Sequence, residues 1–209
     1  MKSQLLATFT TKDNLDETIE KIVDAYTIIF SKVYVLQNEN NVNELICTYN
    51  VDTQDLEVYT LSPDGTTSRV TVDSNGDVGR GCSIIVDYRG FARVAYLDVD
   101  ASSLKVVREN DDTPAVGDEW LVRTLVNDVT ITSPPEIAIY SNGSIAIAYR
   151  DADTGGLDLM RYTGSWWRHT DLVEVGTAED IVLNIDVNDI LHLSFVDTIN
   201  ERVAVISLD

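Results

Sequence analysis

An aromatic residue that ends a strand-like segment recurs along the chain and sets a repeat. Tyr49, Tyr96, Tyr149 and Phe195 follow one another at intervals of 47, 53 and 46 residues. Six positions before each stands a residue that tolerates a tight hairpin turn, namely Asn43, Gly90, Gly143 and Asp189. Such a repeat restricts the chain to folds built from copies of one small β unit.

The later three copies share two further positions. An aspartate follows each aromatic by two residues (Asp98, Asp151, Asp197), and an apolar residue follows it by eight (Leu104, Leu157, Val203). In the first copy the corresponding residues are Asp52 and Leu56, each displaced by one position. A four-stranded antiparallel meander at this period is typical of a β-propeller blade. We therefore predict a mainly β fold of blade repeats, a complete or partial β-propeller.

The predicted strands follow from the repeat. They span 82–88, 92–97, 104–108 and 120–125 in the second copy, 136–140, 144–149, 157–162 and 166–173 in the third, and 181–187, 191–196 and 203–207 in the fourth. The fourth copy thus lacks one strand. An incomplete ring of blades leaves apolar surface and strand edges exposed.

The blade pattern resembles that of β-propellers in the broad sense, including sialidase-like and phage-fibre propellers. The segments Gly90–Asp98 and Gly143–Asp151 carry the resemblance, which extends over roughly residues 33–209. The Asp-box of sialidases is approached only by Ser62–Thr67, with different spacing and without the tryptophan. No arginine triad can be assigned either. The resemblance therefore implies the blade fold and not sialidase activity.

Residues 1–50 are predicted to form a β-α-β-β segment, which can share strands 33–50 with the first blade; residues 51–209 form the propeller-like repeats. The expected strands are 4–10, 32–37 and 44–50. The expected helix has an apolar face made of Leu15, Ile19, Ile22, Val23 and Tyr26. Asn14 and Glu17 have the spacing of a capping box at its start.

Two arrangements complete the last copy. In the first, the strand at residues 5–10 supplies the missing fourth strand and closes the ring. In the second, residues 1–50 stand apart and several chains complete one another in a symmetric assembly. The predicted assembly edge consists of Leu5, Phe9, Val203 and Val205.

The charge balance limits the partners. The chain has 15 Lys and Arg against 35 Asp and Glu, a formal net charge of −20. Nucleic-acid binding and attraction to anionic membranes both need clustered basic residues, so we expect neither. We find no signal peptide and no apolar run near the roughly 20 residues of a membrane span. The expected location is a virion or the cytoplasm of the producing cell.

Cys47 and Cys82 lie in strand-like apolar runs, where a free cysteine acts as a small hydrophobic residue.

The sequence nominates no catalytic residues. Neither His169 nor His192 accompanies a recognisable nucleophile motif, so we expect both to be structural and the protein not to be an enzyme. The acidic turns hold the start of a calcium loop, at Asp98 and Asp100 and again at Asp151 and Asp153, without its later ligands. Aspartate also favours turns by itself. We expect no cofactor, with calcium as the alternative.

Trp166, Trp167 and Tyr162 form an aromatic group that suits stacking on a sugar ring. Packing inside a blade explains one tryptophan of the pair equally well. Two functions follow. The first is a structural assembly module, a capsid, neck or tail component of a phage virion that contacts other protein subunits in an oligomer or larger assembly. The alternative is a carbohydrate-binding β-propeller lectin, with a glycan as the ligand.

Overall fold

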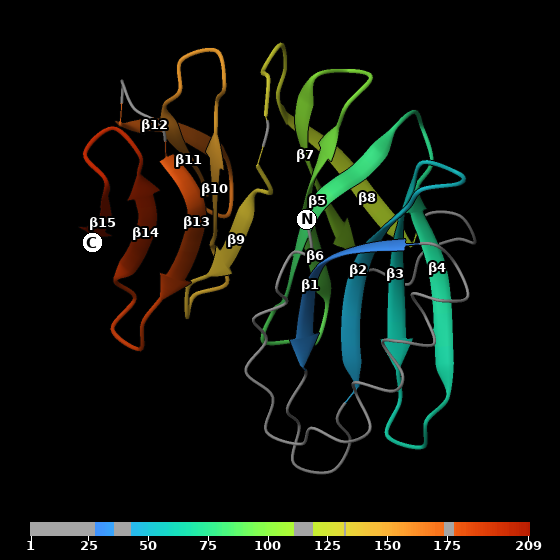
Figure 1. Cartoon of the computed structure of the whole chain (residues 1–209). Helices are drawn as coiled ribbons and strands as arrows, with labels where there is room; N and C mark the ends of the chain where they lie inside the picture. Colours follow the sequence, from blue (N-terminus) through green and yellow to red (C-terminus); the bar gives the residue numbers. More distant parts are fainter. Residues whose placement is uncertain (1–27, 36–42, 111–118, 132, 174–177) are drawn as a thin grey trace.

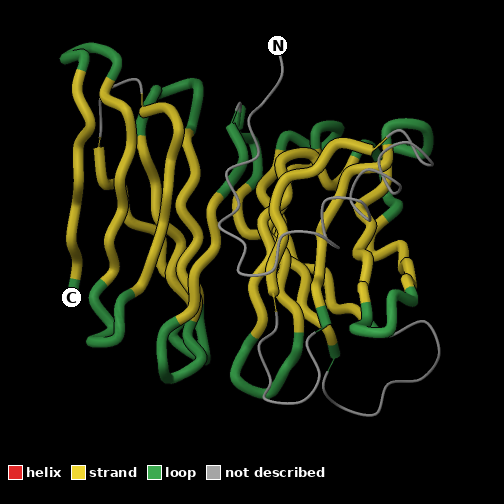
Figure 2. Tube along the Cα trace, turned by 60° about the horizontal axis from the view of Figure 1, so that its bottom comes forward, coloured by secondary structure: helices red, strands yellow, loops and turns green. Residues whose placement is uncertain are grey.

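The computed structural model describes residues 28–35, 43–110, 119–131, 133–173 and 178–209, the first of these ranges by its backbone alone. These residues form four antiparallel β-sheets that follow one another in chain order (Figure 1). Strands make up most of the described chain, and loops gather at their two ends (Figure 2). Within the described ranges there is no helix of the length and apolar character that crossing a membrane requires.

Each sheet is a meander in which consecutive strands pair. The first contains β1 (Ile28–Val35), β2 (Glu44–Asn50), β3 (Asp55–Leu61) and β4 (Thr67–Asp73); the second contains β5 (Val78–Val86), β6 (Ala92–Asp98), β7 (Ser103–Glu109) and β8 (Trp120–Val126). The third contains β9 (Glu136–Ile139), β10 (Ile145–Arg150), β11 (Leu157–Tyr162) and β12 (Trp167–Val173); the fourth contains β13 (Ala178–Ile185), β14 (Leu191–Asp197) and β15 (Arg202–Leu208). The predicted blade repeat is confirmed.

The repeated residues have identifiable structural roles. The four aromatics that set the register lie at or near the ends of β2, β6, β10 and β14, and all are buried: Tyr49, Tyr96, Tyr149 and Phe195. The predicted hairpin residues adopt positive φ at Gly90 (91°), Gly143 (82°) and Asp189 (61°). The second, third and fourth sheets therefore share this hairpin residue and anchor the hairpin with the same kind of side chain.

The recurring aspartates close the next turn of each sheet. Each accepts a hydrogen bond from a backbone amide two or three residues later: Ala101 to Asp98 (2.8 Å), Asp153 to Asp151 (2.9 Å) and Asn200 to Asp197 (3.1 Å). In the first copy Asn50 takes this role, since its Oδ1 accepts the amides of Asp52 and Thr53. Capping of turn amides accounts for the periodic acidic residues.

The core lies between the sheets, in three apolar layers. The first layer, which includes Leu56 and Ile84, joins the first two sheets; the second, which includes Leu104 and Ile147, joins the middle two. The third layer, which includes Leu159, joins the last two. Neighbouring blades of a propeller pack face to face in this way, and each buries apolar surface that a single sheet leaves exposed.

Two glycines in β5 permit a close approach of its neighbours. A Cβ atom on Gly79 (φ 103°) would lie 2.8 Å from Cα of Leu56, in the first sheet. A Cβ atom on Gly81 would lie 2.9 Å from Cα of Pro134, just before the third sheet. Only a residue without a side chain fits at these two positions.

A disulfide between Cys47 and Cys82 joins β2 to β5, and the two Cα atoms lie 6.1 Å apart. The sequence indicated two free, buried cysteines. The burial is confirmed, with 0% and 1% of the residues exposed, whereas the free state is not. The bond forms because the first two sheets face each other at this point, a neighbourhood that the spacing of 35 residues along the chain does not reveal.

The predicted fold class is wrong in one respect. It included a helix within an N-terminal β-α-β-β segment, whereas the described part of the chain contains no helix. β1 and β2 pair antiparallel with each other, and β2 pairs with β3, so these strands belong to the first blade. The β-branched and aromatic residues of β1 favour an extended conformation and start the strand four residues before the predicted Lys32. The helix predicted around Leu15–Tyr26 and the strand at residues 4–10 lie outside the described residues, and the domain boundary at residue 50 stays a prediction.

The described part of the fourth sheet has three strands and one exposed face. Val182, Val203 and Val205 lie on this face with 57%, 70% and 65% of each residue exposed. The opposite face packs on the third sheet through residues such as Leu193. The first sheet differs, because Ile46, on the face turned away from the second sheet, is fully buried. The row of blades thus presents an uncovered apolar face at its C-terminal end.

Candidate functional site

A pocket of about 490 Å³ lies between the second and third sheets. Its walls come from the three later strands of each sheet and from the β9–β10 turn: Arg93, Val106, Arg108, Leu121, Val122 and Arg123 on one side, and Gly143, Ile145, Tyr162 and Trp167 on the other. This volume suits a small organic ligand. One wall carries three arginines and the other carries two aromatic rings.

The arginines come from three successive strands of the second sheet. Arg93 on β6 stands directly opposite Arg108 on β7 in the strand register. Arg123 on β8 stands opposite Val106 of β7, which lies two residues before Arg108 and on the same face of the sheet. Among the residues that the structure describes, no Asp or Glu lines the pocket, although the whole chain contains 35 of them. The pocket is therefore a basic site in an acidic protein.

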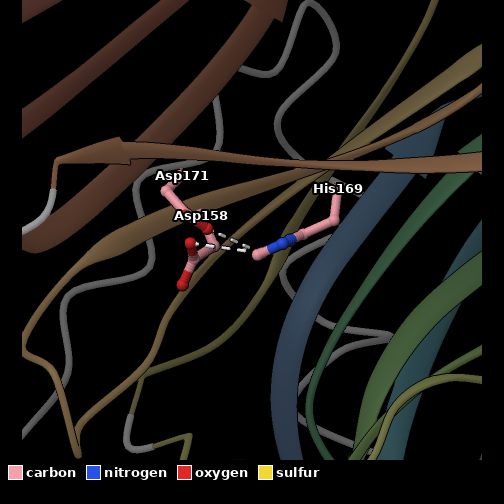
Figure 3. A group of neighbouring side chains, drawn as sticks. All are labelled: Asp158, His169 and Asp171. Carbon is pink, nitrogen blue, oxygen red and sulfur yellow. Dashed lines mark ion pairs between the residues drawn. The ribbon is translucent and has the colours of Figure 1, made fainter.

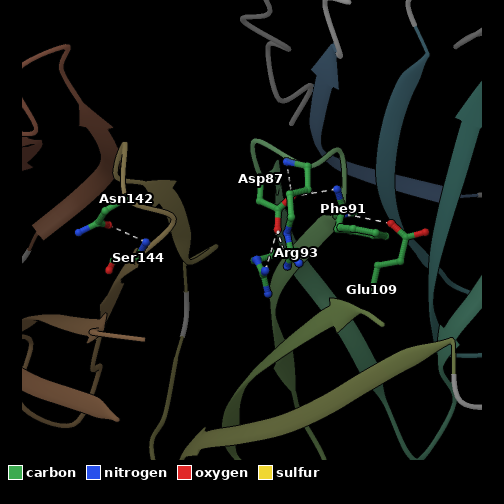
Figure 4. Close-up of polar contacts among 8 residues, drawn as sticks. Asp87, Phe91, Arg93, Glu109, Asn142 and Ser144 are labelled. Carbon is green, nitrogen blue, oxygen red and sulfur yellow. Dashed lines mark hydrogen bonds and ion pairs between the residues drawn. The ribbon is translucent and has the colours of Figure 1, made fainter. Parts of the chain in front are cut away.

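Arg93 is held in place from the β5–β6 turn. Its Nη2 lies 2.8 Å from Oδ2 of Asp87 (Figure 4), whose Oδ1 accepts the amides of Arg89 and Phe91. These contacts hold the pKa of Asp87 below its usual value despite burial. The Nε of Arg93 is buried and has no hydrogen-bond partner. Only 15% of the Arg93 side chain is exposed, so one donor of a fixed guanidinium is left unsatisfied.

The aromatic wall is formed by Tyr162 and Trp167, which pair across β11 and β12. The ring centroids lie 5.2 Å apart at an interplanar angle of 40°. The Tyr162 hydroxyl donates a hydrogen bond to the carbonyl of Gly164 (2.8 Å). Trp166, the third aromatic that the sequence nominated, lies in the turn before β12 with 69% of the residue exposed and does not line the pocket. The structure thus joins two of the three aromatic candidates.

His169, Asp158 and Asp171 lie close together on the third sheet (Figure 3). The strand register places them on the same face as Trp167. Nε2 of His169 lies 3.2 Å from Asp158 and 3.3 Å from Asp171. Burial, together with the neighbouring carboxyl of Asp171, raises the pKa of Asp158 to about 6. The three side chains offer ligand atoms within 4.8 Å of one another. The group can share a proton, and it has the ligand types that a divalent cation accepts.

The acidic turns nominated for calcium are engaged in other contacts. Asp98 is buried and pairs with Nζ of Lys105 at 2.6 Å, and Asp100 accepts the backbone amide of Asp77 at 3.0 Å. Asp151 caps its own turn. In the described part of the chain, the three potential metal ligands that converge are Asp158, His169 and Asp171. None of the aspartates nominated for calcium belongs to this group. The calcium site at these turns stays a prediction.

Sequence reasoning missed the arginine wall. A signal existed, because Arg93 and Arg108 lie at equal distances from the turn between β6 and β7 and must therefore face each other if the hairpin is regular. The link between these arginines and Trp167 had no such signal. It depends on the packing of one sheet on the next.

The comparisons with known proteins support the fold. No protein-family model matches the chain, and no curated protein matches it. Among solved structures, the NanB sialidase from Streptococcus pneumoniae is similar with a TM-score of 0.57 at 14% identity, over 87% of this chain and 31% of that one. The fucose-specific lectin from Aleuria aurantia is similar with a TM-score of 0.56 at 11% identity, over 84% of this chain and 57% of that one. A mutant of this lectin in complex with alpha-methyl-L-fucoside gives a TM-score of 0.52 at 12% identity, over 84% of this chain and 56% of that one. The chain spans well under two thirds of these proteins, and its likeness to them is that of a β-propeller fold.

Proposed function

We propose that this chain is a carbohydrate-binding β-propeller module that takes a sugar into the pocket between the second and third sheets. The observation that carries the proposal is the pair of Tyr162 and Trp167 in the wall of a 490 Å³ pocket. A sugar ring has apolar faces that pack on aromatic rings and hydroxyl groups that need polar partners. The facing arginines supply donors for these hydroxyls.

The fold comparisons support this proposal by analogy. One similar structure is a fucose-specific lectin and another is a sialidase. Fold likeness at this level of identity does not transfer a site. The proposal therefore depends on the pocket of this chain, and it is one of binding rather than catalysis.

The experiment compares two adjacent tryptophans. A glycan array with the native chain identifies the sugars that bind, and Trp167→Ala and Trp166→Ala are then tested on those sugars. We expect Trp167→Ala to lower the affinity at least tenfold, because it removes half of the aromatic wall. Trp166→Ala should stay within twofold, because Trp166 lies outside the pocket. Trp167→Phe, which retains a ring, should recover part of the loss. Absence of any bound glycan, or equal losses in the two alanine variants, would overturn the proposal.

The exposed face of the fourth sheet favours a second function, assembly with another β-sheet. Val203 and Val205, on the edge strand β15, and Val182, on β13, are exposed apolar residues of this face. Val203 and Val205 belong to the predicted assembly edge; its other members, Leu5 and Phe9, lie outside the described residues. Nothing in the structure or the comparisons supports a virion in particular, so the proposed assembly carries no such assignment.

A further inference from the structure

We propose that the pocket between the second and third sheets selects an acidic saccharide, whose carboxylate or sulfate group is bound by Arg93, Arg108 and Arg123. This inference rests on the proposed function, because it names the class of sugar for the same pocket. Four observations about the two walls of the pocket support it.

The first observation is the cross-strand position of two like charges. Arg93 and Arg108 are direct partners in the β6–β7 register, and both line the pocket. Like charges directly opposite each other destabilise a sheet. Asp87 pairs with Arg93 from the turn, and an anion bound in the pocket would be attracted by both arginines at once.

The second observation is that the described residues lining the pocket include no Asp or Glu. Asp87 reaches Arg93 from the turn and fixes its orientation, whereas Arg123 has no carboxylate partner anywhere in the described part of the chain. Within the described part of the chain, the charge of Arg123 is therefore left without a local counter-charge, in a protein with a net charge of −20.

The third observation is the unsatisfied donor. The Nε of Arg93 is buried without a hydrogen-bond partner, and an unmet buried donor costs free energy. The planar guanidinium matches carboxylate and sulfate oxygens, often through two parallel hydrogen bonds. An anionic group near Arg93 gives this donor a partner.

The fourth observation is the opposite wall. Tyr162 and Trp167 face the arginines across the pocket, which fits a ligand with an apolar ring face on one side and an anionic group on the other. General electrostatic attraction does not explain such binding here, because the protein as a whole repels anions. Selection of an acidic sugar would have to come from the pocket.

The test uses three methyl glycosides that differ at one carbon, in both the gluco and the galacto series: the neutral sugar, its 6-carboxylate and its 6-sulfate. Titration calorimetry or NMR gives each affinity, beside an array of longer neutral, carboxylated and sulfated glycans. We expect an acidic form to bind at least tenfold more tightly than its neutral counterpart, and the two acidic arms show which anion the pocket prefers. Preferred binding of neutral sugars would overturn the inference and leave the carbohydrate-binding proposal standing.

Two charge-matched variants locate the effect. Arg123→Gln should reduce the affinity for the acidic sugar about tenfold and that for a neutral sugar much less, because glutamine removes the charge but keeps an N–H donor. Arg168→Gln is the control, since Arg168 is next to Trp167 in sequence, exposed and outside the pocket. Equal effects of both variants would contradict the inference.

A measurement without sugar separates the two proposals. Inorganic sulfate should raise the melting temperature of the native chain more than that of Arg123→Gln. Stabilisation by sulfate with no glycan bound on any array would retain the anion site and overturn the carbohydrate function. Equal response of both proteins to sulfate would overturn the anion site.

Discussion

The ammonium group of Lys105 lies 2.6 Å from Oδ2 of Asp98, and less than a tenth of either side chain is exposed. Asp73, from the first sheet, lies 3.3 Å from the same ammonium group and accepts a hydrogen bond from the hydroxyl of Tyr96 at 2.6 Å. One buried lysine therefore balances two carboxylates at the interface between the first two blades. These charges raise the pKa of Lys105 against the opposing effect of burial.

Replacement of Lys105 by methionine should leave two buried carboxylates without a cation. We expect a loss of roughly 3–5 kcal/mol in the free energy of unfolding, as for other buried pairs that lose one partner. Urea denaturation followed by circular dichroism measures it. Arg202→Met is the matched control, because Arg202 pairs with Asp197 at the corresponding turn but is 66% exposed. A loss as small as that of the control would show that the Lys105 network contributes little.

The disulfide between Cys47 and Cys82 should stabilise the same interface. It closes a loop with a sequence separation of 35 residues, for which loss of chain entropy in the unfolded state predicts about 3–4 kcal/mol. We expect a reducing agent to lower the melting temperature of the native chain. The Cys47→Ala/Cys82→Ala double variant should melt at this lower temperature with or without reductant. A native chain that is insensitive to reductant would contradict the bond.

The repeat was predictable from sequence because its markers perform the same task in each blade. Tyr96 and Tyr149 fill the same position near the end of a second strand, and both are buried. The turns that follow are capped by Asp98 and Asp151. Local hydrogen bonds and strand alternation determine these features, so they leave a pattern in a single sequence.

The pocket and the disulfide were not predictable in this way, because both depend on contacts between sheets. Arg123 and Trp167 lie in different blades, and only face-to-face packing brings them to one cavity. The same holds for Cys47 and Cys82. Tyr162 and Trp167 were nominated from their aromatic character alone, and their pairing across β11 and β12 adds the geometry.

The exposed valines of the fourth sheet predict self-association. We expect the native chain to form an oligomer at tens of micromolar, measured by light scattering coupled to size exclusion. Val203→Glu/Val205→Glu should shift it to the monomer without loss of folding, because both residues are exposed. Val70→Glu, on the outer strand β4 and 45% exposed, is the control and should retain the oligomer. A native chain that is monomeric at every concentration would exclude association of this kind.

The raised pKa of Asp158 predicts how stability changes with pH. Its value of about 6 in the folded chain lies above the ordinary value of about 4 in the unfolded chain, so between these two values the folded state binds more protons. The free energy of unfolding should therefore fall as the pH rises from about 4 to 6, by on the order of 2 kcal/mol from this group. Asp158→Asn has no such titration. Its free energy of unfolding, relative to that of the native chain, should therefore rise as the pH increases across that interval.

Asp197→Asn provides a control of opposite sign. Hydrogen bonds from Asn200 hold the pKa of Asp197 below its usual value, so its contribution to stability is present at neutral pH and is lost as the pH falls. The Asp197→Asn variant should therefore be less stable than the native chain at pH 7 and approach it in acid. Urea titrations at pH 4, 5, 6 and 7 measure Asp158→Asn, and further titrations at pH 2 and 3 measure Asp197→Asn, because the lowered pKa of Asp197 places its loss below about pH 4. Parallel pH profiles for the native chain and Asp158→Asn would show that the group of Asp158, His169 and Asp171 does not retain a proton near neutral pH.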